Sequence, residues 1–238
     1  MNRIAAILPA AGLGTRMGAD TPKQFLELGG EPLVIFTLRR LAACPAITDF
    51  ILATRSEELS FLEDKVSHAR LGRPPRVVHG GETRQQSVAN ALAQVTPETE
   101  IVLVHDAVRP FVTPTQIDRL IQEARIRGAA ILGIPAIDTV KEVKRASLPQ
   151  DVALITSTIP RERIVLAQTP QAFQYKILVD AFARAKQDDM VASDEASLVE
   201  RTGQNVYVVL GSERNLKITR PSDMDLARFY LEQERAGK

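Results

Sequence analysis

Short apolar runs alternate along the chain with longer segments whose apolar residues recur at helical spacing. The runs are rich in Val, Ile, Leu and Ala, which is typical of strands buried on both faces of a sheet. The predicted strands are 4–8, 49–54, 76–78, 100–105, 129–134 and 206–210, and the predicted helices are 32–43, 57–69, 82–94, 113–128 and 221–234.

This alternation predicts an α/β fold. We expect one Rossmann-like domain over residues 1–238, with a mostly parallel central sheet flanked by helices on both faces. Ligands of such sheets bind outside the carboxyl ends of the strands. The loops that carry Arg16, Gly81 and Asp106 all follow predicted strands, so we expect them at one edge of the sheet.

The alternation breaks over residues 136–160, which are rich in Val, Ile and Thr and contain a plausible turn at Ser147–Gln150. This pattern predicts a protruding β-arm, because the segment is too long for a simple connector. A lone two-stranded hairpin is marginally stable and favours a partner. The residues alone leave two interpretations open, a dimerisation arm and a surface insertion.

Three later segments receive a prediction of their own. Thr169–Phe173 is expected to begin a helix. Ser193 is expected to cap a second helix that begins with Asp194 and Glu195, since acidic residues stabilise a helix N-terminus. Leu216–Thr219 is expected to be short and extended.

The stretch Leu8–Phe25 is glycine-rich and directly follows the first predicted strand. Gly12, Gly14 and Gly18 allow tight turns and close approach to a ligand, and Arg16 and Lys23 add two cations. Consecutive backbone amides can bind anions, and fixed cations beside them suit a polyphosphate whose charge moves during reaction.

The spacing of this loop excludes two common glycine-loop classes. Met17 stands five residues after Gly12 and no Gly-Lys pair follows, so the loop is not a P-loop. The glycines read G-x-G-x-x-x-G, which differs from the dinucleotide fingerprint of a nicotinamide dehydrogenase. A plain turn remains the alternative for the glycines taken alone.

Composition narrows the class of protein. The chain has 238 residues, 45% of them hydrophobic and 25% charged, with a net charge of +1. A near-neutral chain gives no support for a nucleic-acid partner, and no apolar run reaches the roughly 20 residues needed to span a membrane. Cys44 is the single cysteine, which excludes an internal disulfide and favours a cytoplasmic protein.

Three further groups of residues are candidates for ligand binding or catalysis. Asp106 and Arg109 follow a buried strand, where they can hold ribose hydroxyls and phosphate or form an ion pair that stabilises the turn. Arg84 and Ser87 open a helix after Gly80-Gly81, which suits either reading a base edge or ordinary capping. Lys217 lies at the end of a short extended run. Taken alone, it is also typical of a solvent-exposed surface lysine. The spacing of the histidines resembles no zinc site. We expect His105 to have an orienting or packing role rather than that of a general base.

The motifs together resemble a known family. Pro9-Ala10-Ala11-Gly12-x-Gly14-x-Arg16-Met17 followed by Pro22-Lys23-Gln24-Phe25 resembles the sugar-nucleotide pyrophosphorylases. Within them, the segments HDAVRP, GGETRQQS, DTVK, TPQ, DEAS and NLKITRPSD are most similar to the 2-C-methyl-D-erythritol 4-phosphate cytidylyltransferases of non-mevalonate isoprenoid biosynthesis. The resemblance covers essentially the whole chain.

The resemblance implies a role for each matching residue. The implied catalytic residues are Arg16, Lys23 and Lys217. The implied CTP-binding residues are Ala10, Ala11, Gly12, Gly14, Thr15, Arg16, Lys23, Gly81, Glu82, Arg84, Ser87, Asp106, Ala107 and Lys217. The implied polyol-phosphate-binding residues are Asp106, Arg109, Thr169 and Lys217, joined by Thr139 and Arg161 from the arm of a second subunit.

The resemblance also implies the reaction and its partners. The 4-phosphate of the polyol would attack the α-phosphorus of CTP and release pyrophosphate. Mg²⁺ or another divalent cation would be bound mainly through the CTP phosphates, with no assigned protein ligand. The chain would act as a homodimer through its arm.

Three alternatives remain at this point. A cytidylyltransferase for ribitol 5-phosphate or a related polyol phosphate is the nearest, although those relatives tend to read Ala-Gly-Gly at Ala10-Ala11-Gly12. A nicotinamide dehydrogenase is disfavoured by the glycine spacing. A non-catalytic nucleotide-binding dimer is disfavoured by the presence of Arg16, Lys23 and Lys217 together.

Overall fold

A computed structural model of the chain describes residues 3–12, 21–144 and 152–237. Its strands are β1 (Arg3–Pro9), β2 (Glu27–Leu28), β3 (Glu31–Pro32), β4 (Asp49–Thr54), β5 (Arg76–His79), β6 (Thr99–Val104), β7 (Ala129–Pro135), β8 (Val140–Val143), β9 (Ile155–Ile159), β10 (Val165–Gln174) and β11 (Tyr207–Leu210). Its α-helices are α1 (Leu33–Ala42), α2 (Leu59–His68), α3 (Arg84–Leu92), α4 (Pro114–Arg127), α5 (Tyr175–Gln187), α6 (Glu195–Arg201) and α7 (Pro221–Ala236).

The central sheet has seven strands in the order β11-β7-β10-β6-β1-β4-β5. All neighbouring pairs are parallel except those of β10, which runs antiparallel to both β6 and β7. The predicted α/β fold with a mostly parallel, helix-flanked sheet is therefore confirmed.

Side chains of the strands alternate between two apolar layers, as a pleated sheet requires. On β1, Ile4, Ala6 and Leu8 pack against α1, α2 and α4, while Ala5 and Ile7 pack against α3, α5 and α6. A third cluster packs α7 against β2 and the segments around Val108 and Ile218. Because strands such as β1 are buried on both faces, their sequences read as continuous apolar runs.

Strand β10 corrects one sequence-based prediction. Thr169–Phe173 does not begin a helix; it lies within β10, and the helix begins at Tyr175. Ala172 and Phe173 are fully buried and pair with both β6 and β7. The strand therefore fills the centre of the sheet, a tertiary constraint that outweighs local pattern.

One further prediction needs a smaller correction. Asp194, not Ser193, caps helix α6, because its carboxylate accepts a hydrogen bond from the Ser197 N–H at 3.1 Å. Residues 216–219, predicted to be short and extended, belong to no helix or strand, and the Ile218 N–H donates to the Val108 carbonyl at 3.0 Å. That bond ties the segment of Lys217 to the chain beyond β6.

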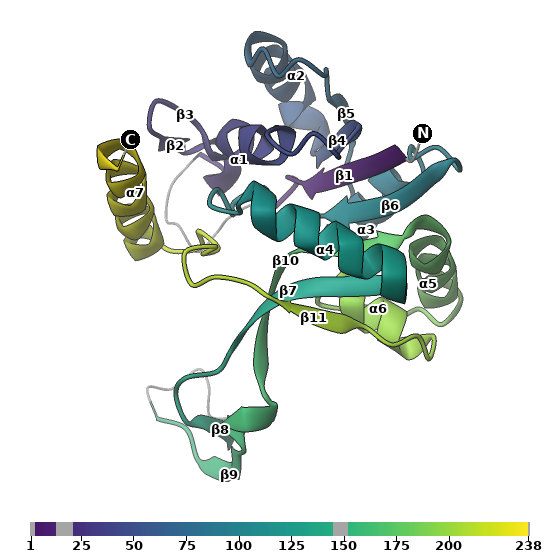
Figure 1. The fold of residues 1–238 in the computed structure, drawn as a ribbon, viewed down its shortest axis with the longest axis vertical. Coiled ribbons are helices and arrows are strands. Elements are labelled where there is room, and N and C mark those ends of the chain that lie inside the picture. The colour runs from purple at the N-terminus through teal and green to yellow at the C-terminus, as the bar shows by residue number, and fades with distance from the viewer. Residues whose placement is uncertain (1–2, 13–20, 145–151, 238) are drawn as a thin grey trace.

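Strands β8 and β9 form a small antiparallel sheet of their own within the segment predicted as an arm. Figure 1 shows this hairpin protruding from one end of the molecule, beyond the extended ends of β7 and β10. Residues 145–151, which contain the whole of the predicted turn, lie outside the described residues.

Candidate active site

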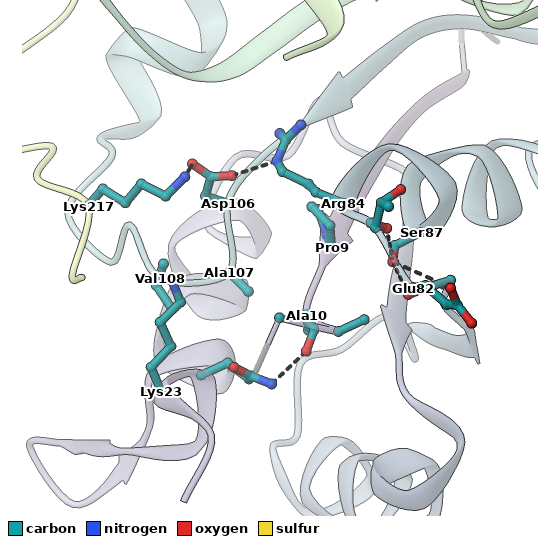
Figure 2. A pocket seen from close by; sticks show the side chains of 15 residues that line it. Pro9, Ala10, Lys23, Glu82, Arg84, Ser87, Asp106, Ala107, Val108 and Lys217 are labelled. Atoms are coloured by element: carbon teal, nitrogen blue, oxygen red, sulfur yellow. Dashed lines mark hydrogen bonds and ion pairs between the residues drawn. The ribbon is translucent and has the colours of Figure 1, made fainter. Parts of the chain in front are cut away.

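Strands β1, β5 and β6 end at the same edge of the sheet, and a cavity lies over their carboxyl ends (Figure 2). The described residues that line it are Pro9, Ala10, Ala11, Gly12, Lys23, Gln24, Gly81, Glu82, Thr83, Arg84, Ser87, Asp106, Ala107, Val108 and Lys217. A second cavity adjoins the first and is lined by Arg84, Asp106, Arg109, Ala167, Gln168, Thr169, Gln171, Ser193, Asp194 and Lys217. The two cavities share Arg84, Asp106 and Lys217.

Most residues that the sequence singled out are brought together here. Eleven of them line the first cavity: Ala10, Ala11, Gly12, Lys23, Gly81, Glu82, Arg84, Ser87, Asp106, Ala107 and Lys217. Arg109 and Thr169 line the second. Gly14, Thr15 and Arg16 lie outside the described residues.

Thr139 and Arg161 lie elsewhere, at the base of the β8–β9 hairpin. Both are exposed, and neither lines the two cavities of this chain. Arg161 donates a hydrogen bond from Nη1 to the Ile137 carbonyl at 2.6 Å, which fixes its position on the hairpin. The described fold therefore does not bring these two predicted site residues to the cavities of their own chain.

Asp106 lies at the centre of a cluster of three cations. Its Oδ1 accepts from Arg84 Nε at 3.2 Å, and its Oδ2 lies 2.9 Å from Lys217 Nζ and 3.3 Å from Arg109 Nε. Figure 2 shows Lys217 and Arg84 reaching Asp106 from opposite sides. The segments that supply these cations are far apart in sequence, so the carboxylate holds the N-terminus of α3 to the segment before α7.

The cluster keeps Asp106 ionised. Burial by itself would raise the pKa of this carboxyl, but attraction to Arg84, Lys217 and Arg109 outweighs burial and holds the pKa below its usual range. Burial by itself would lower the pKa of Arg84, but attraction to Glu195 and then to Asp106 outweighs burial and raises it. The site therefore presents fixed charges at neutral pH, with no group poised as a general base among these four.

A buried hydrogen-bond chain supports Asp106 from behind. The Asp106 N–H donates to Thr169 Oγ1 at 2.9 Å, and that oxygen lies 3.0 Å from His105 Nδ1. His105 Nε2 lies 3.0 Å from the Arg109 carbonyl, which can only accept, so Nε2 carries a proton. Burial lowers the pKa of His105 to about 4. His105 thus orients the strand end, as the sequence predicts.

Asn215 fixes the segment that carries Lys217. Its side chain is fully buried and donates to the Thr169 carbonyl at 2.8 Å, while the backbone carbonyl of Asn215 accepts from Arg109 Nη1 at 2.7 Å. Arg109 is thereby bonded to both Asp106 and Asn215. The ion-pair interpretation of Asp106 and Arg109 is correct, and both residues also line the second cavity.

The turn before α3 is shaped by close packing. A side chain at Gly81 would place its Cβ 2.4 Å from the Cβ of Gln86, so only glycine fits without a shift. Thr83 caps α3 in a reciprocal capping box with Gln86, and the Gly81 N–H donates to Ser87 Oγ at 3.0 Å. Capping and cavity lining are therefore properties of the same turn.

Lys23 reaches the first cavity from the side opposite Glu82 and Ser87 (Figure 2). It begins the short 3-10 helix Lys23–Phe25, whose neighbour Gln24 is buried and donates from Nε2 to the Ala10 carbonyl at 2.7 Å. That bond holds the turn of Lys23 against the end of β1.

Sequence reasoning missed several supporting residues, namely Gln24, Gln168, Glu195 and Asn215. Each is a polar residue that proves to be buried, at 2%, 6%, 1% and 0% exposure respectively. Polar residues are rarely buried without partners. The available signal was that Gln24, Glu195 and Asn215 lie inside the family motifs and Gln168 directly before one, since a polar residue type does not by itself indicate burial.

Within residues 3–12, 21–144 and 152–237, no group of three or more His, Cys, Asp or Glu residues is placed to hold a metal ion. Among the helices described, none is long and apolar enough to cross a membrane.

Three features together define a nucleotidyltransferase. They are the mostly parallel sheet, the glycine-rich sequence that follows its first strand, and the cluster of three cations around Asp106. Comparison with known proteins agrees, since the family model for IspD, 2-C-methyl-D-erythritol 4-phosphate cytidylyltransferase, matches residues 4–233. The chain belongs to the 2-C-methyl-D-erythritol 4-phosphate cytidylyltransferase family.

Individual relatives cover nearly the whole chain. The cytidylyltransferase of this name from Acidobacterium capsulatum is 52% identical over 237 residues, covering 97% of this chain and 98% of the relative. That of Solibacter usitatus is 45% identical over 241 residues, covering 98% of each. The crystal structure of 4-diphosphocytidyl-2C-methyl-D-erythritol synthase from Anaerococcus prevotii has a TM-score of 0.83 at 29% identity, covering 97% of this chain and 96% of that one.

The buried neutral state of His105 predicts a pH-dependent stability. The pKa is about 4 in the folded chain and 6.5 ordinarily, so this contribution is complete above pH 6.5 and is lost as pH falls through 4. The loss amounts to about 3 kcal/mol of unfolding free energy. Urea unfolding of wild type and His105→Gln between pH 7 and 4 measures it, with the exposed His79→Gln as control. Equal pH slopes in wild type and His105→Gln would contradict the assignment.

Proposed function

We propose that the chain joins CTP and 2-C-methyl-D-erythritol 4-phosphate to give 4-diphosphocytidyl-2-C-methyl-D-erythritol and pyrophosphate. The proposal rests on one observation above all: Asp106 gathers Arg84, Arg109 and Lys217 where two cavities meet. One cavity suits a nucleotide and the other a phosphorylated polyol. Two anions that must react need fixed cations between them.

The nucleotide is assigned to the first cavity. The Gly81 turn and Ser87 would face the cytosine, with Ala10, Ala11 and Glu82 beside it. Gly12, Asp106 and Ala107 would hold the ribose. Gly14, Thr15 and Arg16 would contact the triphosphate, and Arg84, Lys23 and Lys217 would complete the set around the phosphates.

The polyol phosphate is assigned to the second cavity, which contains Arg109, Thr169 and Lys217. A phosphate monoester is mostly dianionic at neutral pH because its second pKa is ~6. Its oxygen can therefore attack the α-phosphorus of CTP without a general base, and pyrophosphate departs in line. Catalysis then consists of positioning and electrostatic stabilisation by Arg16, Lys23 and Lys217.

A divalent cation, Mg²⁺ in the first instance, is proposed to arrive with CTP. Both oxygens of Asp106 already accept from cations, so the residues present fit an ion held mainly by phosphate oxygens and water. When bound, such an ion would neutralise charge on the pyrophosphate leaving group. We assign it no protein ligand.

The direct test is product identification. Wild-type protein is incubated with CTP and Mg²⁺ and with either 2-C-methyl-D-erythritol 4-phosphate or ribitol 5-phosphate. We expect turnover of the methylerythritol phosphate, with stoichiometric pyrophosphate. Preferred turnover of ribitol 5-phosphate would overturn the substrate assignment, and CTP binding without pyrophosphate release would overturn the enzymatic one.

Loss of either loop cation should slow the reaction. Arg16→Ala and Lys23→Ala are each expected to lower kcat/KM by roughly 10²–10³, by analogy with removal of one donor to a developing charge. Pyrophosphate release measures the rates. Lys176→Ala, an exposed lysine on α5 that lines neither cavity, serves as the matched control. Near wild-type rates in folded Arg16→Ala and Lys23→Ala proteins would sink the assignment.

We also propose that the arm over residues 136–160 forms a homodimer and lends Thr139 and Arg161 to the partner's second cavity. Its apolar side chains support this, since Ile137, Leu154 and Ile155 are 67%, 65% and 56% exposed. An extended apolar surface on a protruding hairpin is stabilised by a second copy.

Subunit complementation tests the shared site. Lys217→Ala and Arg161→Ala are each expected to be nearly inactive alone. After mixing and re-association, one site in each mixed dimer has both residues intact, so activity should return to about a quarter of wild type. Sedimentation confirms the dimer. Absence of recovery from verified mixed dimers would show that Arg161 acts within its own chain or not at all.

A further inference from the structure

Arg84 divides its hydrogen bonds between two buried carboxylates. Its two terminal nitrogens bind Glu195, with Nη1 2.7 Å from Oε1 and Nη2 3.0 Å from Oε2. Only Nε is directed to Asp106, at 3.2 Å. A guanidinium has a rigid planar fork, so the carboxylate that occupies the fork sets the orientation of the whole group.

Glu195 is itself rigidly held. Its side chain is 1% exposed and it is the first residue of α6. The helix start is tied to β10, because Gln171 accepts from the Ala196 N–H at 3.0 Å and donates to Asp194 at 2.8 Å. Glu195 lines neither cavity, so it does not contact a ligand in either one.

The position of Arg84 determines which cations bind each carboxylate oxygen of Asp106. With the fork occupied, Arg84 reaches only Oδ1, and Oδ2 remains with Lys217 at 2.9 Å and Arg109 at 3.3 Å. If the fork were released, a bidentate pair with Asp106 would become available and would compete with Lys217. The five charged groups Arg84, Arg109, Lys217, Asp106 and Glu195 together carry a net charge of +1. Loss of the Glu195 charge would also raise this net charge to +2.

We propose that Glu195 is a positioning residue for the transfer reaction, acting through Arg84 to keep Asp106 Oδ2 for Lys217. This inference rests on the proposed function, in which Lys217 stabilises charge at the reacting phosphates. A displacement of about 1 Å in such a group can cost up to roughly 10²-fold in rate.

The test is a double-mutant cycle followed by pyrophosphate release from CTP and 2-C-methyl-D-erythritol 4-phosphate. Glu195→Gln keeps the shape of the side chain and removes its charge. We expect kcat to fall about tenfold or more, with KM for CTP changing less than about threefold, because the lost interaction belongs to the transition state. Glu195→Asp should retain more activity than Glu195→Gln.

The cycle separates positioning from folding. If Glu195 acts only through Arg84, then adding Glu195→Gln to Arg84→Ala should cause no further loss of kcat. Additive losses would overturn the proposal. So would a lowered unfolding temperature with unchanged kcat in Glu195→Gln. Turnover by wild type in the same assay tests the proposed function separately, since its absence would reject that function whatever the variants do.

A matched control exists in the same chain. Glu58 has an 8% exposed side chain and binds Arg55 at 2.6 Å, with Arg55 30% exposed against 28% for Arg84. Glu58 lines neither cavity. Glu58→Gln therefore breaks a comparable buried pair and should leave kcat within about twofold of wild type. An equal loss of kcat in Glu58→Gln and Glu195→Gln would mean that stability, not position, is being measured.

Should Glu195→Gln not fold, Glu195→Asp is carried through the same cycle. Its loss of kcat should also vanish in the Arg84→Ala background, and a loss that persists there overturns the proposal.

Discussion

The site depends on the burial of one carboxylate, Asp106, among three cations. A buried carboxylate is unfavourable unless it is paired and hydrogen-bonded, and removal of one partner of such a pair is costly. Asp106 satisfies this requirement with partners from three separate parts of the chain, Arg84, Arg109 and Lys217. The need to pair one charge therefore brings together the turn before α3, the end of β6 and the segment before α7, which together surround both cavities.

The same interaction explains how a nearly neutral chain can handle two polyanions. The net charge is only +1, so the cations must be concentrated locally. Asp106 holds the three cations together and Glu195 orients Arg84, and the cluster is not neutralised because these two carboxylates face three cations. Fixed charges that need no rearrangement during the reaction stabilise a transition state more effectively than mobile ones. The absence of a nucleophile and of a strong base from this cluster agrees with a reaction whose nucleophile is already ionised.

Much of this arrangement could be predicted from the sequence, because it depends on local pattern. Doubly buried strands such as β1 and β6 read as apolar runs, and the motif residues that follow them must meet at one edge of the sheet. What could not be predicted depends on distant contacts. Thr169–Phe173 has no local feature that marks a central antiparallel strand, yet it pairs with β6 and β7. Glu195 is predicted only to begin a helix and Asn215 only to lie in the motif of Lys217, and it is the fold that buries them beside Arg84 and Arg109.

We propose that the charge of Asp106 organises the cations for transfer. The most direct measurement is kcat/KM for Asp106→Asn, by pyrophosphate release from CTP and 2-C-methyl-D-erythritol 4-phosphate, on protein shown to be folded by circular dichroism. Asparagine keeps the shape and removes the charge that holds Arg84, Arg109 and Lys217 together. The account predicts a fall of roughly 10²–10³ in kcat/KM. A folded Asp106→Asn protein within about threefold of wild type would contradict it.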